Sequence, residues 1–117
     1  MLESESEIRA HLSQLAEEPI AHGSSVKKVF INKLLSDSNL TQFAFGSMDV
    51  GENCELHLHP TMDEYFFFLE GTGNYTVDGK VYEVSKDVFL RIPRNTPHSL
   101  VTTGTNPLRF VYFGIAV

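Results

Sequence analysis

From Val26 onward, the chain alternates short apolar runs with turn-forming residues. The runs are rich in Val, Phe and Tyr and are separated by Gly, Pro, Asn or Asp, a pattern typical of strands joined by tight turns. The pattern predicts strands at VKKVFI, TQFAFGSM, CELHLH, EYFFFLE, NYTV, KVYEV, DVFLRI, HSLV and LRFVYFGIAV. So many short, closely spaced strands predict an all-β sandwich or barrel rather than an alternating α/β fold.

One turn can be assigned from the sequence in more detail. Asp78 and Gly79 lie between NYTV and KVYEV. Both central positions of a type I′ turn have positive φ, and Asp-Gly is a preferred pair for them. We therefore expect a two-residue β-hairpin at this point.

The first 22 residues follow a different pattern. Ser4 and Glu7 have the spacing of a capping box, and apolar residues then recur at helical intervals before Pro19, namely Ile8, Leu12 and Leu15. The pattern predicts a short N-terminal α-helix, followed by a loop at 21–25. We expect one domain over 1–117, with the helix and loop in 1–22 and a β-barrel in 26–117.

Composition excludes several classes of protein. The chain of 117 residues is 42% hydrophobic and 21% charged, as expected for one globular domain. Its net charge of −6 argues against nucleic-acid binding, which needs a basic face. The single cysteine, Cys54, excludes an intrachain disulfide and a Cys-rich zinc site. No run resembles a secretory signal or a membrane span, so a cytoplasmic protein without a membrane partner is expected.

Two histidines at alternate positions are the first candidates for chemistry. On a strand, His57 and His59 point to the same face, about 6.6 Å apart, and their rings can converge on one ion. Leu56 and Leu58 are then expected on the opposite face, against a second apolar layer. Pro60 ends this strand because it has no N–H to donate.

Glu64 begins the next predicted strand, where an antiparallel neighbour can bring a carboxylate beside the two imidazoles. The spacing Gly51-x5-His57-x-His59-x4-Glu64-x6-Gly71 resembles the first motif of the cupin superfamily. A second cupin motif is recognisable in DVFLRIPRNTPHSLVT, which contains Pro93, Asn95 and His98. Asp87, Asn95 and Thr102 depart from the family pattern, which usually has Gly, Gly and Asn at these positions. Asn tolerates the left-handed conformation that a turn needs.

The resemblance covers about residues 43–113 and implies a double-stranded β-helix, or jelly-roll, barrel. It also implies that His57, His59, Glu64 and His98 are metal ligands. Three imidazoles and one carboxylate suit one divalent transition metal ion, whether Fe, Mn, Ni, Co, Cu or Zn. His11 and His22 fall outside both motifs, and we expect them to be ordinary surface groups.

The pocket beside this site is expected to be aromatic. If Glu64 points inward, strand alternation also directs Phe66 and Phe68 inward, and we expect Phe110 or Tyr112 from the last strand to complete the lining. Few polar groups are expected there besides the ligands. This favours a small, partly apolar substrate.

The resemblance leaves three functions open, because fold alone does not select among them. Metal-dependent dioxygenase chemistry is the first hypothesis. An isomerase, epimerase or lyase that uses the metal as a Lewis acid is the second, although no further proton-transfer residue offers itself clearly in the sequence. A non-catalytic small-molecule-binding protein is the third. The family commonly pairs its barrels, so a homodimer is expected, with VKKVFI and LRFVYFGIAV as interface strands.

Overall fold

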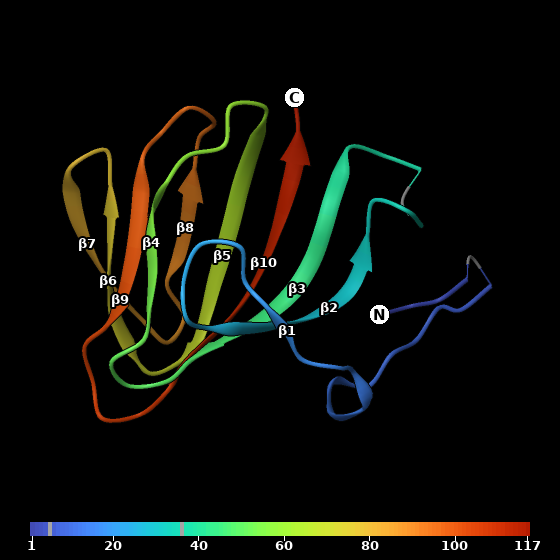
Figure 1. Ribbon diagram of the computed structural model, residues 1–117, viewed down its shortest axis with the longest axis horizontal. Coiled ribbons are helices and arrows are strands. Elements are labelled where there is room, and N and C mark those ends of the chain that lie inside the picture. The colour runs from blue at the N-terminus through green and yellow to red at the C-terminus, as the bar shows by residue number, and fades with distance from the viewer. Residues whose placement is uncertain (5, 36) are drawn as a thin grey trace.

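The protein folds into two antiparallel β-sheets (Figure 1). The computed structural model describes residues 1–4, 6–35 and 37–117. One sheet has the strand order β1-β2-β3-β10-β5-β8 and the other has the order β4-β9-β6-β7. The strands are β1 (Glu18–Pro19), β2 (Val26–Asn32), β3 (Leu40–Met48), β4 (Asn53–His57), β5 (Met62–Glu70), β6 (Thr72–Val77), β7 (Lys80–Ser85), β8 (Phe89–Ile92), β9 (His98–Thr102) and β10 (Leu108–Ala116).

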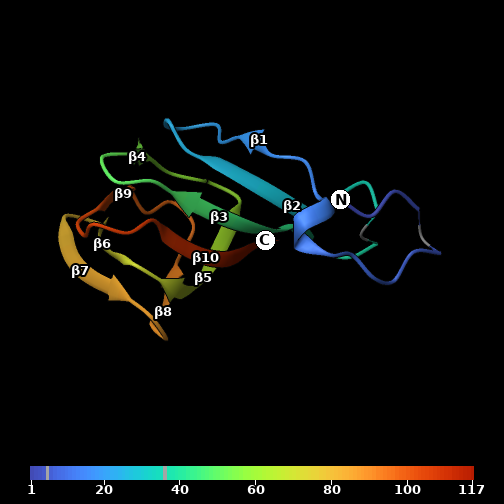
Figure 2. The same cartoon turned by 90° about the horizontal axis from the view of Figure 1, so that it is seen from below.

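The two sheets face each other and enclose the interior, as the view along the strands shows (Figure 2). The last strand, β10, lies at the centre of the larger sheet and pairs with both β3 and β5. Consecutive strands β4 and β5 belong to different sheets, so the chain crosses from one layer to the other between them. This arrangement confirms the all-β double-stranded β-helix expected from the sequence.

The turns have the backbone conformations that their residues predict. Asp78 and Gly79 have φ values of 51° and 80° and join β6 to β7, with Val77 opposite Lys80. The hairpin expected at Asp78-Gly79 is therefore confirmed. Asp87 and Asn95 stand where the cupin pattern has Gly, and both keep positive φ, 71° and 60°. Residues with short polar side chains thus adopt the left-handed backbone conformation at these turns.

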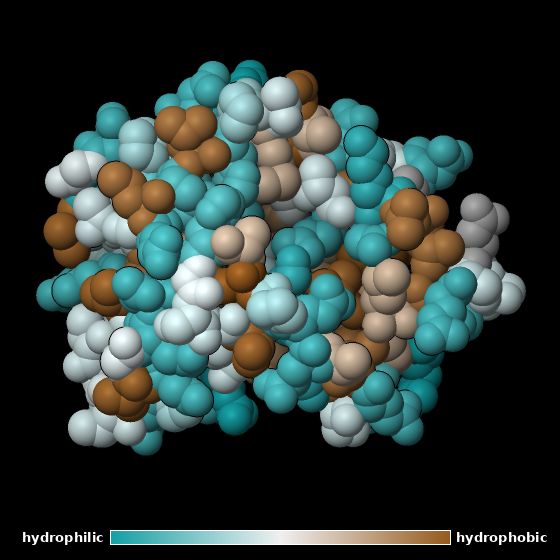
Figure 3. All heavy atoms as spheres, viewed as in Figure 1, coloured by the Kyte–Doolittle hydropathy of each residue, from teal (hydrophilic) through white to brown (hydrophobic). Residues whose placement is uncertain are grey.

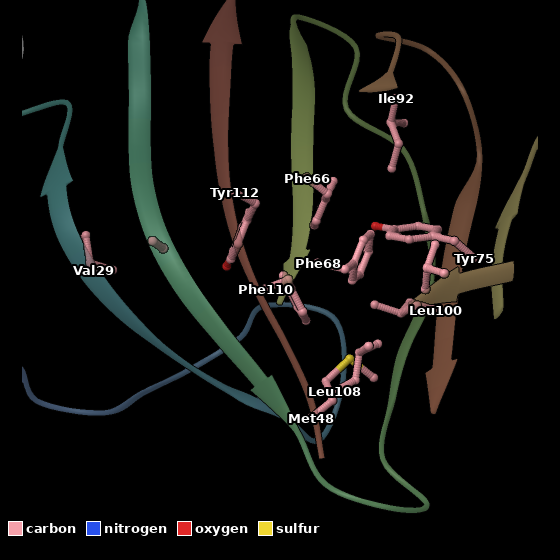
Figure 4. Close-up of a cluster of buried hydrophobic side chains, with 12 residues drawn as sticks. Val29, Met48, Phe66, Phe68, Tyr75, Ile92, Leu100, Leu108, Phe110 and Tyr112 are labelled. Carbon is pink, nitrogen blue, oxygen red and sulfur yellow. The ribbon is translucent and has the colours of Figure 1, made fainter. Parts of the chain in front are cut away.

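The core lies between the two sheets and is largely aromatic (Figure 4). Phe68 of β5 and Leu108 of β10 have no exposed surface, and Tyr75 of β6 and Leu100 of β9 are 2% exposed. Along β5, burial alternates as period-2 geometry requires: Phe66 and Phe68 point inward and Phe67 points outward. Burial of these rings supplies the main driving force for closing the two layers.

The predicted N-terminal α-helix is wrong. The segment forms only a 3-10 turn at Leu12–Gln14, and none of its residues is buried. Ile8, the first residue of the expected apolar stripe, is 94% exposed. The carboxylate of Glu7 accepts a hydrogen bond from the backbone N–H of Glu3. A capping box would have it accept from the N–H of Ser4, so the expected capping box does not form. A helix this short needs a surface that covers its whole apolar stripe, and here Leu12 and Leu15 are only partly buried.

The expectation for Leu56 and Leu58 is also wrong. They do point away from the histidines, but they are 69% and 45% exposed rather than packed on a second layer. All the strands that the structure describes belong to the two sheets, so none of them forms a third layer over the outer face of the smaller sheet. Exposed apolar residues are scattered among polar ones on the face shown in Figure 3. Among the described residues, no helix has the length and apolar character needed to cross a membrane.

Candidate metal centre

Four side chains from three segments of the chain meet at one end of the interior. His57 ends β4, His59 follows it in the loop, Glu64 lies on β5 and His98 begins β9. One potential ligand atom from each lies within 4.8 Å of those of the others. His57 and His98 are directly opposite each other in the β4–β9 register. The structure therefore brings together all four residues that the cupin motifs indicated.

Two hydrogen bonds donated by backbone N–H groups hold the segments that carry these residues. The N–H of Asn95 donates to the carbonyl of His59 at 2.8 Å. The N–H of Arg94 donates to Oδ1 of Asp63, also at 2.8 Å. The turn before β9 thus contacts both the loop between β4 and β5 and the start of β5. This contact fixes His98 relative to His59 and Glu64, although more than 30 residues separate them in sequence.

Carbonyl groups set the orientation of two of the rings. Nδ1 of His57 lies 2.7 Å from the carbonyl oxygen of Glu55, and Nδ1 of His98 lies 2.8 Å from that of Thr96. A carbonyl can only accept a hydrogen bond, so each Nδ1 carries the proton and each Nε2 has a free lone pair. Histidines that bind metals commonly make such a second contact, which fixes both tautomer and ring orientation.

The carboxylate of Glu64 is the electrostatic centre of the cluster. Its Oε1 lies 3.3 Å from Nε2 of His59 and 3.4 Å from Nε2 of His98. Burial opposes ionisation of Glu64, but the two imidazoles outweigh it and lower its pKa to about 2. The contact with Glu64 raises the pKa of His59, whereas burial lowers the pKa of His57. The cluster therefore holds an anionic oxygen among imidazole nitrogens.

One atom of the cluster tests whether these residues fit a metal ion. Among the described residues, Nε2 of His98 is the one buried side-chain nitrogen or oxygen without a hydrogen-bond partner. A buried polar atom without a partner costs free energy. A cation that accepts its lone pair removes this cost, and the accompanying imidazoles and carboxylate are the donors that divalent transition metals prefer. The residues fit such an ion.

A cavity of about 110 Å³ opens beside the cluster. Phe66, Phe110 and Tyr112, expected as pocket residues, line it together with His57, His59 and Glu64. Phe68 does not line the cavity: it is fully buried in the core, and its ring packs against Phe110 with centroids 5.4 Å apart. The rings of Phe66 and Tyr112 are parallel, with an interplanar angle of 2° and centroids 5.1 Å apart. They form a flat aromatic wall.

Two further groups in the wall of the cavity have raised pKa values and stay protonated at neutral pH. Burial, followed by the charge of Glu64, raises the pKa of the Tyr112 phenol above its usual range. The same two causes raise the pKa of the Cys54 thiol to about 11. At neutral pH, the cavity thus presents a neutral phenol and a neutral thiol beside an ionised carboxylate.

Sequence reasoning missed one residue of this site. His22 was expected to be an ordinary surface group, but its ring stacks on His57 with centroids 4.2 Å apart and an interplanar angle of 21°. It also lines the cavity, although its side chain stays exposed on one side. His22 lies in the loop between β1 and β2, and this loop passes beside β4 in both views (Figures 1 and 2). Strands β1 and β2, which flank this loop, pair through only two residues of β1, and no sequence pattern predicted that pairing.

Comparison with known proteins gives results in keeping with this site. The family model for the cupin domain matches residues 44–114. An uncharacterized protein of Methanocaldococcus jannaschii is 39% identical over 62 residues, which are 53% of this chain and 50% of that protein. Dimethylsulfoniopropionate lyase DddW of Ruegeria pomeroyi is also 39% identical over 62 residues, 53% of this chain and 40% of the lyase. The chain thus matches half or less of the length of these relatives.

A solved structure shows the likeness of fold over nearly the whole chain. It is that of a predicted oxalate decarboxylase from Thermotoga maritima, with a TM-score of 0.87 at 21% identity. The match covers 94% of this chain and 100% of that one.

Proposed function

The chain belongs to the cupin family, and from this premise we propose that it is a metal-dependent enzyme acting on a small organic molecule. The observation that carries the proposal is the position of the four-residue cluster. His57, His59 and Glu64 line a cavity, and the buried His98 lies beside Glu64 with its Nε2 lacking a hydrogen-bond partner. A metal centre open to a cavity suits a catalytic role better than a structural one, in which all coordination positions are closed.

The proposed cofactor is one divalent transition metal ion, either Fe, Mn, Ni, Co, Cu or Zn, held by His57, His59, Glu64 and His98. When bound, such an ion supplies a Lewis acid with open positions for substrate or dioxygen. The chain's own groups prepare the site for it. The low pKa of Glu64 keeps its carboxylate ionised, and the carbonyl contacts of His57 and His98 keep their Nε2 lone pairs free.

The cavity indicates the class of substrate. Its volume of about 110 Å³ suits a molecule of few heavy atoms, smaller than a typical drug-sized ligand. The parallel rings of Phe66 and Tyr112 favour an apolar portion. An oxygen atom at the other end of the substrate would reach the cluster. We therefore propose a small, partly apolar molecule with a carboxylate, carbonyl or enol oxygen.

Of the reaction classes, we favour cleavage or isomerisation with the metal as a Lewis acid. The sequence offered no clear proton-transfer group for this chemistry, but the structure places the neutral phenol of Tyr112 in the cavity wall. Such a phenol stays protonated and can donate a hydrogen bond to a developing negative charge on the reacting molecule. The partial relative from Ruegeria pomeroyi is a lyase, which supports the same class.

Dioxygenase chemistry uses the same ligand set, so measurement must separate the two. The metal-loaded protein is incubated with small carboxylates, enols and aromatic alcohols while oxygen uptake and product formation are followed. Product formation without oxygen uptake supports the lyase or isomerase class, and incorporation of deuterium from deuterated water supports proton transfer to carbon. Oxygen uptake coupled to product formation would contradict the lyase or isomerase proposal and indicate a dioxygenase. Tight binding without product identifies a non-catalytic binding protein.

We further propose that the chain forms a homodimer through the outer face of the larger sheet. Aromatic rings in sequential contact cross this face from β2 to β8, with centroid distances of 5.0 to 6.3 Å: Phe30, Phe43, Phe113, Tyr65 and Phe89. Phe89 is 59% exposed. A two-fold interface brings the same patch of both subunits together, so an apolar face of this kind can be covered by its own copy. The expected cytoplasmic location and lack of a nucleic-acid partner remain proposals.

A further inference from the structure

The loop that carries His22 is fastened to the strand that carries His57. The backbone N–H of Glu55 donates to the carbonyl of His22 at 2.6 Å, and the carbonyl of Glu55 contacts Nδ1 of His57 at 2.7 Å. The backbone of Glu55 thus contacts both His22 and His57, the two members of the stacked imidazole pair. The N–H of Ser24 adds a second connection by donating to the carbonyl of Asn53 at 3.3 Å.

Gly23 makes this close approach possible. It forms an isolated antiparallel bridge with Cys54. A Cβ atom at position 23 would collide with the carbonyl oxygen of Asn53 and approach Cα of Cys54 to 3.0 Å. Because these are backbone atoms, they cannot move aside as a side chain can. A residue with a side chain at this position would therefore push the loop, and His22 with it, away from β4.

The ring of His22 packs against His57 rather than joining the ligand set. The described residues whose potential ligand atoms lie within 4.8 Å of one another are His57, His59, Glu64 and His98, without His22. A metal lies in the plane of the imidazole that binds it, and the two stacked rings have nearly parallel planes, inclined at 21°. Their nitrogens therefore do not converge on one point. His57 is only partly buried, and His22 covers one face of its ring.

We propose that His22 is a positioning residue that holds the imidazole of His57 in its metal-binding orientation by stacking. The carbonyl of Glu55 and, at 3.8 Å, Sγ of Cys54 contact the Nδ1 edge of His57, but contacts along one edge still let the ring rotate about it. The stacked ring of His22 removes this freedom. The inference rests on the proposed function, since it assumes that the four-residue cluster binds a metal ion. The proposed role depends on the flat ring of His22, which stacks on His57, and not on its nitrogen atoms.

The test measures Co²⁺ binding to the metal-free, full-length protein by absorption of the Co²⁺ d–d bands. Four variants are compared with the unaltered chain: His22→Ala, His22→Phe, Gly23→Ala and His11→Ala. His22→Ala removes the stacking ring, and its Kd for Co²⁺ should rise by about 10- to 100-fold, the range found for groups that orient metal ligands. His22→Phe keeps a flat ring without nitrogens and should restore most of the affinity and the band positions.

The other two variants test the geometry. Gly23→Ala replaces no histidine, but it displaces the loop that carries His22. It should therefore weaken Co²⁺ binding as His22→Ala does. His11 is exposed, precedes the 3-10 turn and does not line the cavity, so His11→Ala should bind Co²⁺ as the unaltered chain does. Circular dichroism of each apo variant shows whether the β-sheet content is retained.

The outcomes separate this inference from the proposed function. If the unaltered chain does not bind Co²⁺, the metal centre itself is refuted. If it binds Co²⁺ and His22→Ala or folded Gly23→Ala binds equally well, only the positioning role is refuted. Equal weakening by His22→Phe and His22→Ala would also overturn it, because the nitrogen atoms and not the ring packing would then be required.

Discussion

Nε2 of His98 lies 3.4 Å from Oε1 of Glu64 in the protein interior, although 34 positions separate the two residues in the sequence. The same oxygen lies 3.3 Å from Nε2 of His59. Both distances exceed the usual range of N–H···O hydrogen bonds, 2.7 to 3.2 Å. The three groups therefore face one another without closing into hydrogen bonds of ordinary length, an arrangement that leaves their lone pairs available to a cation.

The first prediction concerns the ligand set. Single replacements of His57, His59 or His98 by Ala should each lower metal affinity by more than about 100-fold, beyond the effect of outer-shell changes, because each removes a direct bond to the ion. Metal content after dialysis, measured by atomic emission, checks this. His11→Ala is the matched control and should keep full occupancy. Full occupancy in the His59→Ala protein would show that the ligand assignment is wrong.

The second prediction concerns removal of the metal. Chelation should leave the β-sheet circular dichroism spectrum unchanged, because burial of the aromatic core stabilises the barrel without the ion. The free energy of unfolding should fall only by the binding linkage, about 2.7 kcal/mol if the free metal had been at 100 times its Kd. Thermal melts with and without chelator measure this. Complete unfolding on chelation would instead mean that the metal is structural.

Phe68 provides a test of the core that does not involve the cavity. It is fully buried and lies outside the cavity lining, so Phe68→Ala should lower the free energy of unfolding by about 3 to 5 kcal/mol. Phe67 is the matched control on the same strand, since its side chain points outward and is 39% exposed. Phe67→Ala should cost much less. Chemical denaturation of both variants makes the comparison, and equal losses would contradict the assigned strand faces.

Cys54 should react slowly with alkylating reagents in the folded protein. Burial and the charge of Glu64 raise its pKa to about 11, so the reactive thiolate is scarce at neutral pH. The rate of modification by iodoacetamide should rise about tenfold per pH unit between pH 7 and 9, because thiolate is formed as pH approaches the raised pKa. The unfolded chain is the control and should react faster at every pH in this range. A rate that levels off near pH 8.5 in the folded protein would contradict the raised pKa.

The proposed homodimer predicts a sedimenting species of twice the chain mass at micromolar concentration. Replacing Phe113 by Glu places a charge at the middle of the outer aromatic row, where it contacts Phe43 and Tyr65. This variant should sediment as a monomer, because an interface excludes an unpaired charge. Val81→Glu, on the exposed face of the smaller sheet, is the control and should remain dimeric. A monomeric unaltered chain would overturn the proposal.

The strands and the motif that contains the cluster could be predicted from local sequence patterns. Period-2 alternation is a local property, so the inward direction of Phe66 and Phe68 followed from Glu64 alone once that residue was taken to point inward. The Asp78-Gly79 hairpin was equally local, because a two-residue turn is set by the conformations of its own residues. The spacing of the histidines and Glu64 indicated which side chains would meet, through the resemblance to the cupin motifs.

What each face of a segment contacts became known from the packing of the folded chain. Helical spacing in the N-terminal segment predicted a helix, but no surface was available to cover Ile8. Alternation placed Leu56 opposite the histidines, yet it could not show that this face of the sheet is left to solvent. His22 reaches His57 because the β1–β2 loop is fastened to β4 by long-range backbone contacts. Such contacts depend on where distant strands lie, and the local sequence pattern does not encode them.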